Sequence, residues 1–242
     1  MDDRFAENEL KDPRPGLNGR VVSSQLAESS LAFSRPKTAA DNSADGLNVV
    51  VLAGRWDPKL CSEHDIDETR LTLATAFSEA HSGYRFKRIL IELMDAQDRL
   101  WASAVPLFRI RSNWPDEHRA LAVIEKPDLQ GYDGSVLARH FSCPLPCLFL
   151  RASDQELLLA ALDNPTDESL TKQLGLTKEA IKRRWKVLFE RVENEMPEMF
   201  EAIQNVDRKG RGPQRRHVIL AYIRKHPEEL RPFARVMTAQ IP

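Results

Sequence analysis

Residues 166–192 read TDESLTKQLGLTKEAIKRRWKVLFERV, and this stretch decides the fold expected for the C-terminal part of the chain. Thr166 and Thr177 are residues that cap the start of a helix. Gly175 is suited to the left-handed backbone that often follows the last turn of a helix. We therefore expect one helix over residues 167–174 and a second from Lys178 to about residue 193. Two helices joined by a three-residue turn that contains glycine form a helix-turn-helix motif.

The second of these helices is predicted to have two chemically different faces. At 100° per residue, one narrow stripe is apolar and comprises Ile181, Trp185, Leu188 and Val192. The opposite side comprises Glu179, Lys182, Arg183, Lys186 and Glu190, with its cations in the first half of the helix. A helix of this kind fits the major groove of DNA, where Lys and Arg reach phosphates or guanine O6 and N7. We predict that Lys182, Arg183 and Lys186 contact DNA and that the backbone N–H groups at Thr177 and Lys178 hold a phosphate.

A further helix is expected before this motif. Ser153 and Glu156 have the spacing of a capping box, and Asn164-Pro165 stops the helix. An apolar stripe lies between these signals and comprises Leu157, Leu158, Ala161 and Leu162.

A second basic cluster follows the motif and comprises Arg208, Lys209, Arg211, Arg215 and Arg216. Pro213 suits the first turn of a new helix, whose apolar face comprises Val218, Ile219, Tyr222 and Ile223. We predict that Arg211 and Arg215 contact backbone phosphates, which makes binding sensitive to salt. The alternative is a linker before a helical tail that covers the core or pairs two subunits.

Residues 150–192 resemble the LuxR-type helix-turn-helix domain. The shared positions, without a gap, are Glu156, Leu157, Leu158, Leu174, Gly175, Leu176, Thr177, Ile181 and Lys182. Ala180 stands where that family has Thr, and Arg184 where it has His. The resemblance implies sequence-specific binding of double-stranded DNA, usually as a homodimer, with base reading at the positions of Lys182, Arg183 and Lys186. We include Arg184 among the predicted DNA-binding residues.

Charge and composition agree with a soluble DNA-binding protein. Residues 1–164 hold 19 Lys and Arg against 25 Asp and Glu, whereas residues 165–242 hold 16 against 11. A basic end of this kind hints at a polyanionic partner. No apolar run approaches the roughly 18–20 residues of a membrane span. The acidic start does not resemble a secretory signal, and the three cysteines form no even disulfide set. We therefore expect a cytoplasmic protein that does not enter membranes.

The N-terminal part is predicted to be a small α+β domain of about 100 residues. Residues 1–46 are rich in polar and small residues, and we expect a flexible arm there. Residues 47–147 form the expected input or dimerisation domain, with a helix over residues 65–80 and a hairpin of residues 88–93 and 100–105. Its other expected strands are residues 48–52 and 120–125. The fold class is thus α+β, followed by an all-α helix-turn-helix domain over residues 148–196 and a basic, helical extension over residues 197–242.

Signals for other functions are weak. The chain lacks a phosphate-cradling glycine loop, a Gly-x-Ser-x-Gly elbow and a His-Glu-x-x-His motif, so we predict no enzyme and no cofactor. Cysteine and histidine occur together in two groups without the usual zinc spacing, and we predict no metal site: Cys61 with His64, and His140 with Cys143 and Cys147. Two alternatives stay open. One is a sigma-factor-like or anti-sigma module that contacts RNA polymerase, and the other is an enzyme in residues 47–147 regulated by the helical domain.

Overall fold

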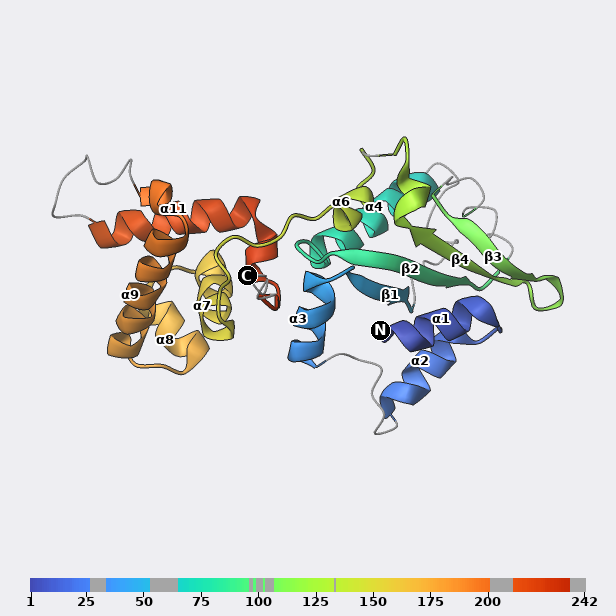
Figure 1. Ribbon diagram of the computed structural model, residues 1–242, viewed down its shortest axis with the longest axis horizontal. Coiled ribbons are helices and arrows are strands. Elements are labelled where there is room, and N and C mark those ends of the chain that lie inside the picture. Colours follow the sequence, from blue (N-terminus) through green and yellow to red (C-terminus); the bar gives the residue numbers. More distant parts are fainter. Residues whose placement is uncertain are drawn as a thin grey trace, which may run out of the picture. The chain divides into compact units, whose positions relative to one another are not determined.

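The protein divides into two compact units, unit 1 (Met1–Cys143) and unit 2 (Pro144–Pro242). The computed structural model describes residues 1–26, 34–52, 65–95, 98, 102, 107–132, 134–200 and 211–235, without the side chains of residues 24–26, 65–67, 70 and 211–213. All strands of this described part lie in unit 1, and unit 2 contains helices (Figure 1). The α+β class is therefore confirmed. The predicted division after residue 147 lies close to the observed one.

A four-stranded mixed sheet forms the centre of unit 1, in the order β1-β2-β4-β3. The strands are β1 (Leu47–Val51), β2 (Phe86–Leu93), β3 (Arg109–Trp114) and β4 (Arg119–Glu125). β1 and β2 are parallel and are linked through helix α4 (Asp65–Ala80), whereas β4 runs antiparallel to both β2 and β3. The expected helix and the strands expected near residues 48–52 and 120–125 are confirmed.

Alternation along the strands sends side chains to opposite faces of the sheet, and apolar clusters lie on both faces. On one face, Ile89 and Ile124 pack with Phe86, and Phe77 of α4 and Phe141 of helix α6 (Ala138–Phe141) cover them. On the other face, Leu90 packs with Leu17 and Val21 of helix α2 (Leu17–Leu26). Figure 1 shows α4 and α6 on one side of the sheet and helices α1 (Asp3–Lys11) and α2 on the other. The sheet is thus buried on both faces.

The described part of residues 1–46 is helical, which differs from the flexible arm predicted from its composition. It forms α1 (Asp3–Lys11), α2 (Leu17–Leu26) and α3 (Arg35–Ser43). Leu17 and Val21 of α2 are buried against Leu90 and Leu121 of the sheet. The buried Glu92 carboxylate also accepts hydrogen bonds from the backbone N–H groups of Gly16 and Asn18, at 2.7 and 3.3 Å. The composition of residues 1–46 did not predict these helices, because the apolar contacts between α2 and the sheet are few and join residues that are far apart in the sequence.

The predicted hairpin of residues 88–93 with 100–105 is wrong. Both edges of β2 are occupied, one by β1 and the other by β4, so no third strand can pair with it. Most of residues 96–106 lie outside the described part, and Ala102 within it is helical. β3 and the two short 3-10 helices η1 (Pro115–Glu117) and η2 (Lys126–Leu129) were not predicted.

Unit 2 consists of helices around one apolar core. Its elements are α7 (Ala152–Asp163), α8 (Asp167–Leu174), α9 (Lys178–Glu195), η3 (Pro197–Phe200), α11 (Arg211–Lys225) and η4 (Pro227–Leu230). Trp185, Leu188 and Phe200 are buried in the same cluster as Ile219 of α11. Residues 197–242 were predicted to be a basic, helical extension, and their described part completes the core that α7, α8 and α9 begin, in agreement with the alternative of a helical tail that covers the core.

One predicted helix start is wrong in detail. Helix α7 begins at Ala152, so Ser153 lies inside the first turn and does not cap it. Asp154 accepts the backbone N–H of Arg151 at 3.2 Å in its place. Among the helices of the described residues, none combines the length and the apolar character that crossing a bilayer requires.

Candidate nucleic-acid interface

The turn between α8 and α9 has the local geometry that the sequence predicts. Thr166 and Thr177 cap α8 and α9, with their hydroxyl groups accepting the N–H groups of Ser169 and Ala180 at 3.3 and 3.2 Å. Gly175 follows α8 with φ of 65°, in the left-handed region that costs residues with a Cβ about 1–2 kcal/mol. These features set where α9 begins and in which direction it leaves the turn.

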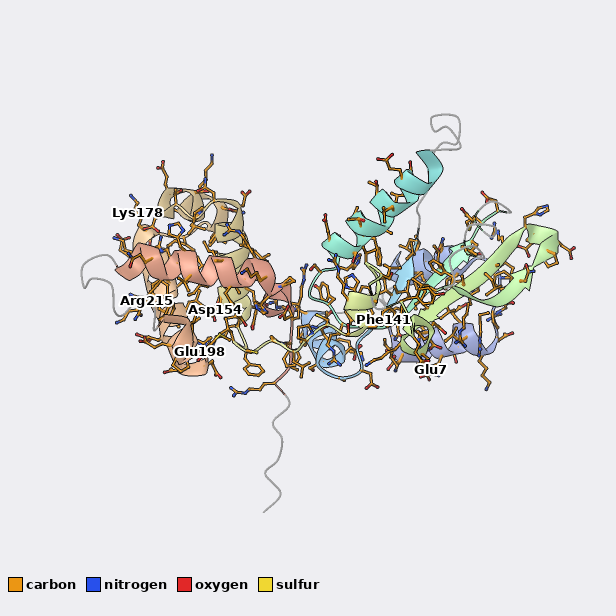
Figure 2. All side chains as sticks on the ribbon, turned by 90° about the horizontal axis from the view of Figure 1, so that it is seen from above. Glu7, Phe141, Asp154, Lys178, Glu198 and Arg215 are labelled. Carbon is orange, nitrogen blue, oxygen red and sulfur yellow. The ribbon has the colours of Figure 1, made fainter. Side chains whose placement is uncertain are left out.

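The two faces of α9 are divided as predicted. Its buried residues are Ile181, Trp185, Leu188 and Val192, which all belong to the core of unit 2. Its exposed cations are Lys178, Lys182, Arg183 and Lys186. Figure 2 labels Lys178, where the helix begins. The four cations outnumber the exposed acids of α9, which are Glu179, Glu190 and, at the last position of the helix, Glu195, so the exposed charges of the helix sum to +1.

The exposed cations are held only weakly by the rest of the unit. Lys186 lies 3.9 Å from Glu190, and 79% and 61% of the two side chains are exposed. An ion pair of this exposure contributes little to stability and exchanges readily with other anions. In the part of the chain that the structure describes, the side chains of Lys182 and Arg183 form no ion pair. All three side chains are therefore available to phosphates or base edges.

Arg184 lies at the border of this face. Its guanidinium is 4.0 Å from the Glu156 carboxylate of α7, and 31% of the side chain is exposed. About two turns further on, Arg191 pairs with the buried Asp154 of α7 at 3.3 Å. Both arginines face α7, so we place Arg184 at the edge of the candidate interface and not among its central residues.

Arg215 is engaged inside unit 2, which differs from its predicted role as a phosphate contact. Its guanidinium donates to the Glu193 carboxylate at 3.4 Å and stacks 4.7 Å from the centre of the Phe200 ring. Only 19% of the side chain is exposed. We therefore remove Arg215 from the candidate interface. Arg211 begins α11, but its side chain lies outside the described residues.

A buried carboxylate joins the two ends of unit 2. Glu229 of η4 is 1% exposed, and its carboxylate accepts the N–H groups of Cys147 and Leu148 at 2.8 and 3.0 Å. The Tyr222 hydroxyl donates to the same carboxylate at 3.2 Å. Burial raises the pKa of Glu229 above its ordinary value, and partial burial together with the nearby Glu229 carboxylate raises the pKa of the Cys147 thiol. This network holds α11 in place on the core, and Cys147 contributes its backbone N–H to it.

The Ser78 and His140 side chains of unit 1 are adjacent, but they form a closed internal network. The Ser78 hydroxyl donates to the Val136 carbonyl at 2.7 Å and lies 2.7 Å from His140 Nε2. Arg139 Nε also donates to this hydroxyl, at 2.8 Å. Ser78 and His140 are 0% and 1% exposed, so a substrate has no access to them. The pair connects α4 to α6.

Among the described residues, no group of His, Cys, Asp and Glu has an arrangement that could hold a metal ion. The His140 side chain contacts Ser78. Cys61 and His64 lie outside the described part of the chain.

Comparison of the chain with protein-family models, with curated proteins and with solved structures finds no match.

Two residues with a clear position in unit 2 were not singled out from the sequence. Arg216 of α11 forms an ion pair with Asp167 of α8 at 2.6 Å and stacks 4.8 Å from the centre of the Trp185 ring. Arg216 appeared only as one member of a basic cluster, and Asp167 only as the first residue of an expected helix. The two residues are 49 positions apart, so no local pattern connects them.

Proposed function

We propose that unit 2 binds double-stranded DNA by inserting the exposed face of α9 into the major groove, and that the protein is a bacterial-type transcription regulator. The observation that carries this proposal is the exposure of Lys182, Arg183 and Lys186 along one side of a helix whose other side is buried in the core. The LuxR-like pattern of residues 150–192 supports the same function and a homodimeric form.

The length and position of α9 fit this role. The helix has 18 residues, which corresponds to roughly 27 Å at 1.5 Å per residue. Its cations lie in the first three turns, next to the capped start, and recognition helices contact base edges mainly with their N-terminal residues. The exposed N–H groups at the start of α9 lie beside these cations and favour a phosphate at the same end.

The test begins with the full-length protein and a pool of random duplexes, from which bound sequences are selected. Affinity for a selected duplex is then measured by fluorescence anisotropy for the wild type, Lys182→Ala and Lys186→Ala. We expect each substitution to weaken specific binding by about 1–3 kcal/mol, because each removes a contact to the duplex.

The matched control is Arg224→Ala, which removes an exposed cation from the last turn of α11 in the same unit. This variant is expected to bind the selected duplex as the wild type does. Selection of no duplex would contradict the proposal, and so would wild-type affinity in both lysine variants.

A further inference from the structure

We infer that Arg216 is a positioning residue that sets the angle between α8 and α9, and thereby the direction in which α9 enters DNA. The part of this inference that concerns DNA rests on the proposed function, whereas the part that concerns the packing of α8 and α9 does not. Its basis is that one guanidinium on α11 contacts both helices of the turn at once, through the Asp167 carboxylate and the Trp185 ring.

The position of Asp167 makes this contact effective. Asp167 is the first residue of α8, and the turn to α9 follows the last residue of α8. The eight residues of α8 separate the ion pair from the turn by roughly 12 Å. A tether at the end of a helix far from its hinge limits rotation about the hinge more than one close to it.

The contact to the Trp185 ring connects Arg216 to α9, the second of the two helices that form the angle. Trp185 lies at the middle of α9 and is 1% exposed. A guanidinium over an indole face is attracted by the ring, and the attraction is strongest where water is excluded. Arg216 is 21% exposed, so it is largely withdrawn from solvent. It therefore connects α8 to the buried side of α9 while leaving the exposed side of α9 open.

Neighbouring arginines do not replace this connection. Arg191 ties α9 to α7 through Asp154, and Arg215 ties α11 to the end of α9 through Glu193. Among the ion pairs formed by the described residues of unit 2, Arg216–Asp167 is the one that reaches α8. Loss of Arg216 is therefore expected to loosen α8 in particular.

A positioning role and a direct phosphate contact predict opposite results for Asp167→Asn. If Arg216 contacted a phosphate, removing the acid beside it would free the guanidinium and lower the negative charge, so DNA would bind more tightly. If Arg216 positions the helices, the same substitution weakens their tether, and DNA binds more weakly. A lysine at position 216 cannot reproduce the planar stacking and forked hydrogen bonding of arginine.

The experiment compares Arg216→Ala, Arg216→Lys and Asp167→Asn with the wild type in the full-length protein, with Arg224→Ala on the same helix as the control. Affinity for the selected duplex is measured over a range of salt concentrations, and hydrogen exchange of the α8 amides is measured without DNA. We expect all three variants to bind roughly tenfold more weakly with an unchanged salt slope, and their α8 amides to exchange faster. The control is expected to match the wild type in both measurements.

Three outcomes would overturn the inference. They are tighter binding in Asp167→Asn, a salt slope reduced by about one in Arg216→Ala with rescue by lysine, and unchanged exchange in α8. If Arg216→Ala does not fold, the two conservative variants carry the same comparison. If the wild type binds no DNA, the proposed function fails, but the exchange of α8 still decides whether Arg216 sets the helix angle.

Discussion

Unit 1 and unit 2 use charged side chains in different ways. In unit 1, the buried Glu92 carboxylate caps the start of α2 and pairs with Arg119 at 3.5 Å. One buried carboxylate thus connects the sheet to the helix that covers it. In unit 2, arginines on the inner side of the helices form ion pairs with acids of neighbouring elements, whereas the cations on the outer side of α9 stay exposed. A basic residue of unit 2 therefore stabilises the fold where a neighbouring element brings an acid within reach, and stays exposed where none does.

The largest effect expected concerns the core of unit 2. Trp185→Ala removes a side chain that is 1% exposed, and its indole N–H has no hydrogen-bond partner among the described residues, so the loss is one of packing and of the Arg216 contact to the ring. We expect the free energy of unfolding of unit 2 to fall by about 3–5 kcal/mol. Hydrogen exchange in urea, followed separately for the amides of each unit, measures this change. An equal loss of protection in the strands of unit 1 would show that the two units unfold as one and would break the comparison.

The next effect concerns unit 1 and its pH dependence. Burial lowers the pKa of His140 from its ordinary value of 6.5 to about 4, and the nearby charges of Arg139 and His81 act in the same direction. The unfolded chain therefore binds a proton between pH 6.5 and pH 4 that the folded unit does not. We expect the free energy of unfolding of unit 1 to fall as the pH falls through this range, by up to about 3 kcal/mol.

The control for this prediction is His140→Asn, which removes the titrating group. Urea titrations at several pH values, read from the strand amides, compare the control with the wild type. The control is expected to have a lower stability at neutral pH and a flatter pH dependence between pH 6.5 and pH 4. The same slope in both proteins would mean that other groups account for it.

The smallest effect compares one glycine from each unit. Gly175 has φ of 65°, and Gly19 lies within helix α2, where an added Cβ would have no heavy atom of the described residues within 4 Å. Because only the first requires a left-handed backbone, we expect Gly175→Ala to lower the stability of unit 2 by about 1 kcal/mol. Gly19→Ala is expected to raise the stability of unit 1 by about 0.5–1 kcal/mol. Thermal unfolding of the two variants provides the test, and a shift of the same sign in both would contradict it.

Local sequence patterns predict much of unit 2 and part of unit 1. The caps at Thr166 and Thr177 and the glycine at position 175 predict the ends of α8 and α9, because these signals act within a few residues of the chain. The spacing of Ile181, Trp185 and Leu188 predicts the buried side of α9, since helical periodicity alone decides which residues share a face. The exposed side of α9 follows from the same periodicity.

The remaining features depend on contacts between distant residues. Arg215 and Arg216 are adjacent in a basic cluster, but Glu193 and Asp167 lie within reach of them only after α11 has packed on the core. The helices of residues 1–46 are likewise stabilised by the sheet, where Leu17 and Val21 are buried. The order of the strands could not be predicted from local patterns, because pairing of β2 with β4 is decided by which apolar strand is free to join it.

The most direct test of the central claim, that the exposed face of α9 binds DNA, compares two double variants with the same loss of charge. Lys182→Ala with Lys186→Ala removes two cations from α9, and Arg224→Ala with Lys225→Ala removes two exposed cations from the end of α11. The account predicts that the α9 variant binds the selected duplex roughly thirtyfold more weakly or worse, while the α11 variant retains wild-type affinity. Equal losses in the two variants, or no loss in the α9 variant, would contradict it.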